Sequence, residues 1–317
     1  MNHVPQKVLI IGIQGALSKI TAELLIKKFP HVKIHGVDSR SIHGLEHRPE
    51  ISTEKIKYNR TNFEKIFREH QFDCVLHLGR LGHARAINDM NQRINVNLVG
   101  TNTILDLSSK FQCKKVVILS THHVYGALAD NPMFLTENSP LRASFKFPEL
   151  RDVVEMDQMC TNWMWKNQNN IDTVVLRPAN IVGPQINNSI TQYLKTPYAP
   201  IPLDYNPMFQ FVHEFDMAEI ITQAVTNLTT GIYNVANDEV ISLHEAVDVI
   251  GIKKTNTPII LVEQLAKIIS PLWKFPNYLI DYVKYPTTLD NSHLKSKLGE
   301  NIFRFNSKEA LELLKLN

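Results

Sequence analysis

The chain has 317 residues, of which 44% are hydrophobic and 21% are charged, and its formal net charge is +3. This composition is ordinary for a globular protein with a large core, organised as two domains or as one large α/β domain with an appendage. No basic run or stripe is present, so nucleic-acid binding is not indicated. Cys74, Cys113 and Cys160 are too few and too scattered for a disulfide framework or a zinc site, and we expect reduced thiols in the core of a cytoplasmic protein.

The sequence indicates neither a secretory signal nor a membrane span. The apolar run at residues 8–13 is short and leads into a glycine turn. The most membrane-like stretch, residues 259–280, is interrupted by charged residues and prolines, so it cannot supply the ~20 apolar residues of a spanning helix. A helix that covers a pocket is the more economical interpretation of this stretch, with an amphipathic surface helix as the alternative. We expect no membrane partner.

The first half of the chain alternates short apolar runs with longer helical patterns. This order favours a parallel sheet covered on both faces, which is a doubly wound α/β fold of the Rossmann type. Helices are predicted at 16–29, 63–70, 94–110, about 148–166, 211–227 and 242–250, the last after a cap at Ser242. Strands are predicted at 7–12, 33–38, 73–79, 114–120, 172–183 and 231–237.

The pattern changes after Gly183. Residues 184–210 carry five prolines and little periodicity, as in an irregular lobe or loop. We therefore expect a dinucleotide-binding Rossmann domain at 1–183, to which residues 211–237 return. Residues 184–210 and 238–317 are expected to form a smaller C-terminal substrate-binding lobe.

Two glycines mark a candidate dinucleotide turn. Gly12 and Gly15 lie between a strand and a helix, where a Cβ would obstruct the tight turn and the approach of a pyrophosphate. Asp38 ends the next strand, at the spacing of about 20 residues at which a carboxylate meets a ribose 2′-hydroxyl. A carboxylate repels a 2′-phosphate, so Asp38 favours NAD over NADP, although the neighbouring Arg40 leaves NADP open. The alternative is a doubly wound protein that kept the turn and lost the nucleotide.

Several motifs together resemble one enzyme family. Gly12-x-x-Gly15-x-x-Ser18 is similar to the GxxGxxG of the extended short-chain dehydrogenase/reductases, and the remaining similarities extend along nearly the whole chain. They are HLG (77–79), NLVGT (97–101), LSTHHVYG (119–126), LRPANIVGP (176–184), FVHEFDMAEII (211–221) and GIYNVAN (231–237). On these residues the chain resembles the NAD-dependent epimerase/dehydratase family. The resemblance implies an NAD-binding Rossmann domain, a smaller C-terminal domain and a nucleotide-sugar substrate, with a homodimer as a possible assembly.

The resemblance also assigns roles by position. Thr121 takes the place of the hydroxyl residue that binds the reacting sugar, and Asn180 and Arg80 are candidate substrate contacts. Asn180 could instead only cap a turn, and Arg80 could be a solvated loop charge. No metal ligand set is implied. The candidate cofactor contacts are Gly12, Gln14, Gly15, Asp38, Arg40, Asn59, Arg60, Leu78, Gly79 and Asn97.

The segment FPELRDVVE (147–155) departs from the family at its two catalytic positions. The family has a tyrosine and, four residues later, a lysine; here these positions hold Glu149 and Val153. A glutamate of ordinary pKa ~4.3 is a weak base for an alcohol, although burial can raise its pKa. Valine provides no positive charge for the ribose or for an alkoxide. We therefore predict that standard hydride transfer is severely impaired, with Glu149 as the only candidate replacement in this segment.

Two histidines add a further possibility. STHHVYG resembles the STDEVYG of sugar-nucleotide dehydratases, in which two acidic residues do acid–base work, so His122 and His123 are candidate proton carriers. Because side chains alternate along a strand, we expect at most one of them to face the cofactor. Solvated or hydrogen-bonded histidines without a catalytic role are the alternative.

Two main hypotheses follow. The first is a family member that still converts a nucleotide sugar, with Thr121, a histidine and Glu149 in place of the usual groups. The second is a catalytically inactive relative whose bound dinucleotide supports a regulatory or scaffold role. Reuse of the site for chemistry without hydride transfer is a third possibility.

Overall fold

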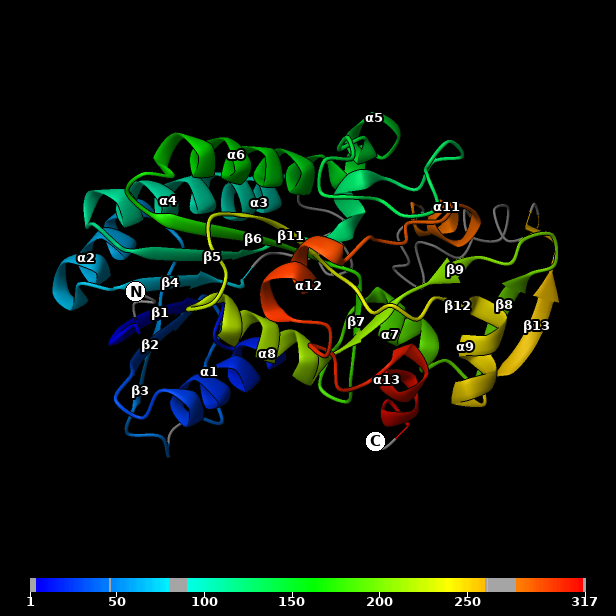
Figure 1. Cartoon of the computed structure of the whole chain (residues 1–317), viewed down its shortest axis with the longest axis horizontal. Coiled ribbons are helices and arrows are strands. Elements are labelled where there is room, and N and C mark those ends of the chain that lie inside the picture. The colour runs from blue at the N-terminus through cyan, green and yellow to red at the C-terminus, as the bar shows by residue number, and fades with distance from the viewer. Residues whose placement is uncertain (1–3, 46, 80–89, 260, 262–277, 316–317) are drawn as a thin grey trace.

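A seven-stranded parallel sheet forms the centre of the protein in this computed structural model, which describes residues 4–45, 47–79, 90–259, 261 and 278–315 (Figure 1). The strand order is β11-β6-β5-β4-β1-β2-β3, and every neighbouring pair is parallel. The strands are β1 (Lys7–Ile11), β2 (Lys33–Asp38), β3 (Ile51–Lys55), β4 (Cys74–His77), β5 (Lys115–Leu119), β6 (Asp172–Pro178) and β11 (Gly231–Val235). The predicted Rossmann-type α/β fold is confirmed.

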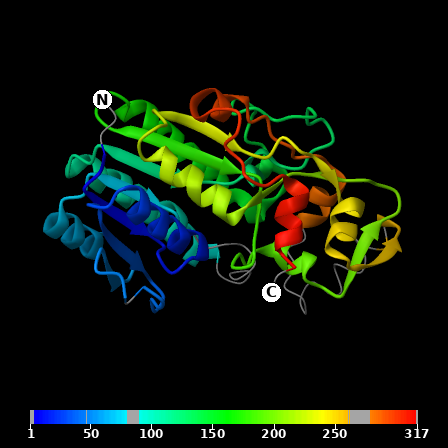
Figure 2. The same ribbon diagram turned by 60° about the horizontal axis from the view of Figure 1, so that its bottom comes forward.

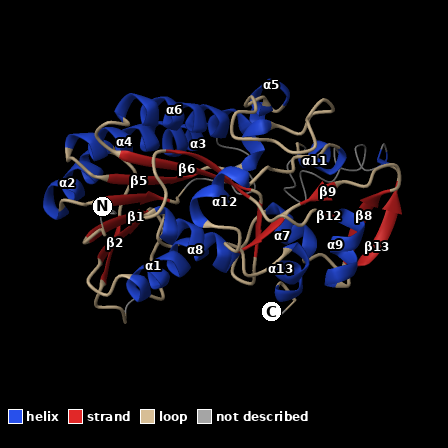
Figure 3. Cartoon of the chain, viewed as in Figure 1, coloured by secondary structure: helices blue, strands red, loops and turns tan. Residues whose placement is uncertain are grey.

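Helices cover both faces of this sheet, as the blue and red layers of Figure 3 show. On one face lie α1 (Ala16–Lys28), α8 (Glu214–Ala224) and α12 (Ser292–Leu298), and the view in Figure 2 brings α1 and α8 forward. On the other lie α2 (Arg60–His70), α4 (Thr101–Lys110) and α6 (Arg151–Asn167). Alternate residues of each strand point to opposite faces. In β1, for example, Val8 and Ile10 pack on the first side and Leu9 and Ile11 on the second.

Several element boundaries differ from the sequence expectation. The strand β3 was not predicted. The expected strand at 172–183 is divided into β6 and a short β7 (Asn180–Val182), which pairs outside the main sheet with β10 (Phe211–His213). The expected helix at 94–110 begins with a short α3 (Met90–Arg93) and a π-helical segment, η2 (Ile94–Gly100), before α4. The helix near 148 begins with a 3-10 turn, η4 (Pro148–Leu150).

A smaller lobe lies beyond the carboxyl ends of the strands and has its own apolar cluster. Residues 184–210 were expected to be irregular but contain a helix and two short strands. The elements of this lobe are α7 (Ser189–Leu194), β8 (Tyr198–Pro202), β9 (Met208–Phe209), β12 (Ile241–Ser242), α9 (Leu243–Ile250), β13 (Lys253–Thr257), α11 (Leu279–Lys284) and α13 (Ser307–Leu313). Ser242 caps α9 as predicted, since its hydroxyl accepts the N–H of Glu245 at 3.2 Å.

In the part of the chain that is described, no helix combines the length and apolar character needed to cross a membrane. All three cysteines are buried and unpaired. Burial raises the pKa of the Cys113 thiol to about 12, which makes it unreactive at neutral pH.

A buried ion pair joins α6 to the end of the sheet. Asp157 accepts hydrogen bonds from Arg177 Nε at 3.0 Å and from Nη2 at 2.6 Å, and the Ser120 hydroxyl donates to the same carboxylate. Arg177 also donates to the Tyr125 hydroxyl at 3.0 Å. Because Ser120 directly precedes Thr121, this network holds the end of β5 in place.

Removing one partner of this pair should strongly destabilise the fold. Arg177→Ala leaves the Asp157 carboxylate buried without its cation, so we expect the free energy of unfolding to fall by about 3–5 kcal/mol in urea titrations. Arg68→Ala, which breaks the exposed pair with Glu64, is the control and should have a much smaller effect. Equal effects of the two substitutions would contradict this account.

Candidate functional site

Two glycines bring the ends of β1 and β4 into direct contact. Gly12 adopts φ +87°, a conformation that favours glycine. A Cβ added to Gly12 would lie 2.4 Å from the Gly79 Cα, and one added to Gly79 would lie 2.7 Å from the Gly12 Cα. No side chain fits at either position. The two glycines therefore let the strand ends pack together at the carboxyl edge of the sheet, the edge at which doubly wound folds bind nucleotides. Neither glycine is among the residues that line the cavity described below.

The N-terminus of α1 faces the space beside this turn. Gly15 is its N-cap and has no side chain to accept the N–H groups of the first turn. Gln14, Gly15, Ala16 and Leu17 all line the adjoining cavity. Uncapped N–H groups together with the helix dipole favour an anion, so this turn fits a pyrophosphate. The small Ser18 at the third motif position is buried, as its packing role requires.

The end of β2 adds a carboxylate and a guanidinium. Asp38 is buried and accepts the backbone N–H of Gln14 at 3.1 Å. Arg40 forms a two-pronged ion pair with the same carboxylate. Burial by itself would raise the pKa of Asp38, but the hydrogen bonds and charge of Arg40 outweigh it and hold the pKa below its usual value.

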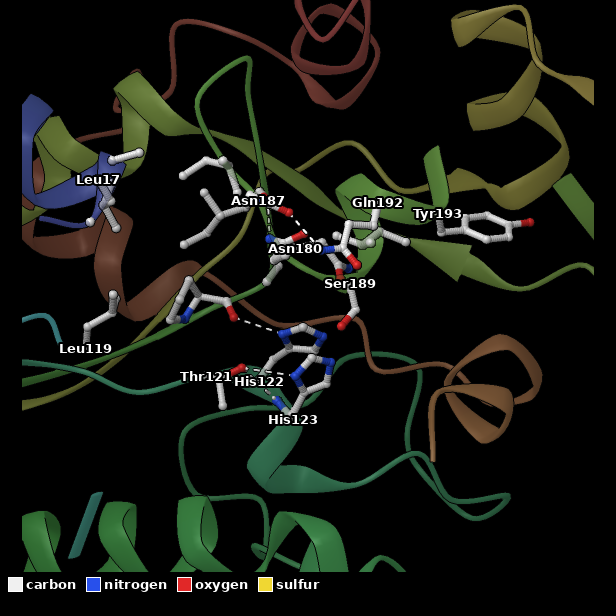
Figure 4. Close-up of a pocket in the computed structure, with 18 of the residues that line it drawn as sticks. Leu17, Leu119, Thr121, His122, His123, Asn180, Asn187, Ser189, Gln192 and Tyr193 are labelled. Atoms are coloured by element: carbon white, nitrogen blue, oxygen red, sulfur yellow. Dashed lines mark hydrogen bonds between the residues drawn. The ribbon is translucent and has the colours of Figure 1, made fainter. Parts of the chain in front are cut away.

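A cavity of about 640 Å³ runs from this turn into the smaller lobe. Figure 4 shows Thr121, His122 and His123 on one side and Asn180, Asn187, Ser189, Gln192 and Tyr193 across from them. Its size is within the range of small-molecule sites. The residues from 185 to 193 come from the segment expected to be irregular, and nothing in their sequence marked them as site residues.

Thr121 and the two histidines meet in this cavity. Thr121 caps a short 3-10 helix, η3 (His122–Tyr125), and its hydroxyl lies 3.3 Å from His123 Nδ1. The expectation that strand alternation turns the two histidines to opposite sides was wrong. The strand ends before them, and the 3-10 turn places both rings at the same cavity, with ring centroids 4.2 Å apart. His122 Nδ1 lies 2.9 Å from the Pro178 carbonyl oxygen (Figure 4). Since a carbonyl only accepts, Nδ1 carries a hydrogen.

Two tyrosines from the smaller lobe pack on these histidines. The ring centroids of Tyr282 and His123 are 4.7 Å apart at a nearly perpendicular angle, and the Tyr282 hydroxyl donates to the His123 carbonyl at 2.7 Å. The ring centroids of Tyr278 and His123 are 5.9 Å apart, and Tyr278 also lines the cavity. The sequence did not mark either tyrosine as a site residue, because both lie far along the chain: Tyr278 in the stretch 259–280 interpreted as a cover for a pocket, and Tyr282 just after it.

The two replaced catalytic positions lie away from these groups. Glu149 is exposed and is not among the described residues that line the cavity, so the structure does not bring its carboxylate together with Thr121. Its backbone carbonyl accepts a hydrogen bond from Arg93 at 2.6 Å. Val153 is 1% exposed and belongs to the apolar core.

Of the other predicted site residues, some line the cavity and others only support the fold. Leu78 lines the cavity, and Asn180 does so while donating to the Gln210 carbonyl at 3.3 Å. Asn59 caps α2 through the N–H of Asn62, and Arg60 pairs with Asp106 at the surface. Asn97 donates to the buried Asp152 at 2.7 Å. Arg80 lies outside the described residues. Among the described residues, no cluster of histidines, cysteines and carboxylates could hold a metal ion.

The glycine contact gives a direct test of the turn. Gly12→Ala should abolish dinucleotide binding and destabilise the protein, because the new methyl group meets the Gly79 backbone. Gly251→Ala is a matched control, since Gly251 has φ +83° but a Cβ added there would meet nothing within 4 Å. For Gly251→Ala we expect the free energy of unfolding to fall by roughly 1–2 kcal/mol, because alanine is strained in a left-handed conformation, while dinucleotide binding stays unchanged. Thermal unfolding and titration of reduced-dinucleotide fluorescence measure both effects, and equal binding by the two variants would contradict the assignment.

His77, which ends β4 beside this turn, predicts acid sensitivity. Its Nε2 bonds the Thr101 hydroxyl at 2.7 Å, and burial lowers its pKa from 6.5 to about 4. Between these values the unfolded chain binds the extra proton, so stability falls as the pH drops from 6.5 towards 4, by up to about 1.4 kcal/mol per pH unit.

The substitution His77→Gln keeps a partner for Thr101 but cannot titrate. Urea titrations across this pH range should therefore show a shallower loss of stability in the variant than in the wild type. The exposed His31→Gln provides the control. An unchanged slope in His77→Gln would rule out this contribution.

The parallel sheet, the glycine turn after β1 and the uncapped helix at its carboxyl edge define a protein of the Rossmann fold class. The model of the NAD-dependent epimerase/dehydratase family matches residues 8–236, and the chain belongs to this family. The family resemblance seen in the sequence is thereby confirmed.

Individual relatives are distant. A UDP-glucose 4-epimerase from Dictyostelium discoideum is 23% identical over 259 residues, which cover 72% of this chain and 74% of that protein. UDP-glucose 4-epimerase 2 from Arabidopsis thaliana is 26% identical over 192 residues, 56% of this chain and 53% of the relative. An uncharacterized protein of Mycobacterium tuberculosis is 24% identical over 184 residues, 58% and 49% of the two chains. The chain thus spans about half the length of the last two relatives.

Solved structures share the fold over nearly the whole chain. A Thermus thermophilus UDP-glucose 4-epimerase in complex with NAD has a TM-score of 0.75 at 20% identity and covers 97% of both chains. A Bacillus anthracis dTDP-glucose 4,6-dehydratase in complex with NAD has a TM-score of 0.74 at 17% identity, covering 98% of this chain and 95% of that one. At these identities the likeness establishes the fold.

Proposed function

We propose that this protein binds a nicotinamide dinucleotide, with NAD as the expected form, and a nucleotide sugar in the same cavity. We further propose that it lacks the usual tyrosine–lysine apparatus for hydride transfer. One observation carries the second part of this proposal: the position of the family's lysine holds Val153, which is buried in the apolar core, and the position of the tyrosine holds the exposed Glu149. The uncapped first turn of α1, which lines the cavity, supports the first part.

The residues of the cavity have distinct proposed roles. A bound nicotinamide supplies a hydride acceptor. The Thr121 hydroxyl is placed to hold a substrate hydroxyl group, while its contact with His123 Nδ1 keeps it oriented. The Pro178 carbonyl fixes the hydrogen of His122 on Nδ1, which sets the orientation of this ring beside Thr121. These groups can bind and polarise a substrate, but they do not provide the cation that stabilises an alkoxide beside the cofactor.

The relatives supply the expected ligand class. A Thermotoga maritima UDP-glucose 4-epimerase was solved with UDP-glucose, and a Bordetella bronchiseptica enzyme with NAD and UDP. The alternative function is a catalytically inactive protein that uses the bound dinucleotide for a regulatory or scaffold role. The loss of both catalytic side chains favours this alternative over efficient turnover. A homodimer remains a prediction from the family resemblance.

Binding and turnover separate these functions. We expect titration calorimetry to detect binding of NAD and of at least one UDP-, dTDP- or GDP-sugar. We expect the absorbance of the reduced nicotinamide to appear at least about 10²-fold more slowly than in a relative with the tyrosine–lysine pair. Glu149→Gln should change neither binding nor residual turnover, because its carboxylate points to solvent. Glu155→Gln, in the following helix α6, is the control, since Glu155 is paired with Arg151 and does not line the cavity.

Two results would contradict the proposal. A protein that binds no dinucleotide would reduce the relationship to a shared fold. Rapid turnover that is lost in Glu149→Gln but kept in Glu155→Gln would make Glu149 catalytic, against the geometry described above.

A further inference from the structure

The Asp38 carboxylate is fully engaged by its own chain. Oδ1 accepts the backbone N–H of Arg40 and its Nε, both at 2.9 Å. Oδ2 accepts the N–H of Gln14 at 3.1 Å and Arg40 Nη2 at 2.8 Å. An ionised carboxylate has about four acceptor positions, so these four hydrogen bonds saturate it. A ribose hydroxyl can bind Asp38 only by displacing one of them.

The Arg40 guanidinium lies between Asp38 and solvent. The Asp38 side chain is 3% exposed, whereas that of Arg40 is 50% exposed and lines the cavity. Asp38 engages Nε and Nη2 of Arg40, which leaves the Nη1 hydrogens unused by this carboxylate. A ligand that enters at this end of the cavity therefore meets the cation of the pair, with the carboxylate beneath it.

A second cation lines the same end. Lys19 is a cavity residue, and its Nζ donates to the His43 carbonyl at 2.6 Å. The N–H of His43 in turn donates to the Gln14 side chain at 2.9 Å, so the segment after β2 is tied to the glycine turn. The charge that a ligand meets here is positive, because Arg40 neutralises Asp38 while Lys19 is bonded only to a neutral carbonyl among the described contacts.

This arrangement changes the expected cofactor preference. An unpaired carboxylate at the end of β2 binds the ribose diol and repels a 2′-phosphate, whereas an arginine accepts the phosphate through charge-assisted hydrogen bonds. We propose that Arg40 makes the adenosine end of the site accept a 2′-phosphate, so that the protein binds NADPH about as well as NADH. This inference rests on the proposed function and revises the preference for NAD expected from Asp38 alone.

Dissociation constants of NADH and NADPH, measured by fluorescence titration of the full chain, test this inference. In the wild type we expect the two dissociation constants to agree within about tenfold. In Arg40→Ala we expect the affinity for NADPH to fall by about ten- to hundredfold, while the affinity for NADH is unchanged or higher. Arg48→Ala is the matched control. Arg48 is also half-exposed and paired with a carboxylate, that of Glu23, but it does not line the cavity.

The binding measurements distinguish a failure of this inference from a failure of the proposed function. A wild type that binds NADH more than about tenfold more tightly than NADPH, or an Arg40→Ala variant whose ratio of the two constants is unchanged, overturns the role of Arg40 and leaves dinucleotide binding intact. A wild type that binds neither dinucleotide instead overturns the proposed function.

Discussion

The site depends on the contact between two bare backbones, at Gly12 and Gly79. β1 and β4 are neighbours in the sheet, and their ends meet so closely that a single methyl group on either glycine would overlap the other chain segment. This contact fixes the path of the chain into α1 and leaves the first turn of that helix open towards the cavity. It also brings Gln14 to Asp38, which links the turn to β2. The pyrophosphate position that we propose, at the first turn of α1, follows from this one steric constraint.

The two halves of the site differ from the family pattern to different extents. The half expected to hold the dinucleotide retains its turn, its open helix end and its carboxylate. In the other half, the first turn of α6 is held by a buried polar cluster. Arg93 contacts both the Glu149 carbonyl and the Asp152 carboxylate, and Asn97 contacts the same carboxylate. The Asp152 carboxylate is thus held by Arg93 and Asn97, and Val153 packs beside it as an ordinary core residue.

Much of the fold and of the dinucleotide turn could be predicted from the sequence, because both depend on local patterns. The apolar periodicity of β1 and α1 and the spacing from Gly12 to Asp38 are readable in a single chain. The pairing of Asp38 with Arg40 could be suspected from their proximity, but their geometry could not. The orientation of His122 and His123 was mispredicted because a 3-10 turn replaces the strand at that point. Tyr278 and Tyr282 reach the site only through the folding of the distant smaller lobe, which local patterns do not specify.

The central claim is that a nicotinamide ring bound in this cavity has no phenol–ammonium couple beside it. A crystal structure of the protein with NADH and a sugar nucleotide tests it most directly. The account predicts the pyrophosphate at the Gly12–Gly15 turn and the nicotinamide near Thr121 and His122, with no tyrosine hydroxyl and lysine amine together within hydrogen-bonding distance of the ring or its ribose. A tyrosine and a lysine from other parts of the chain converging there would contradict it.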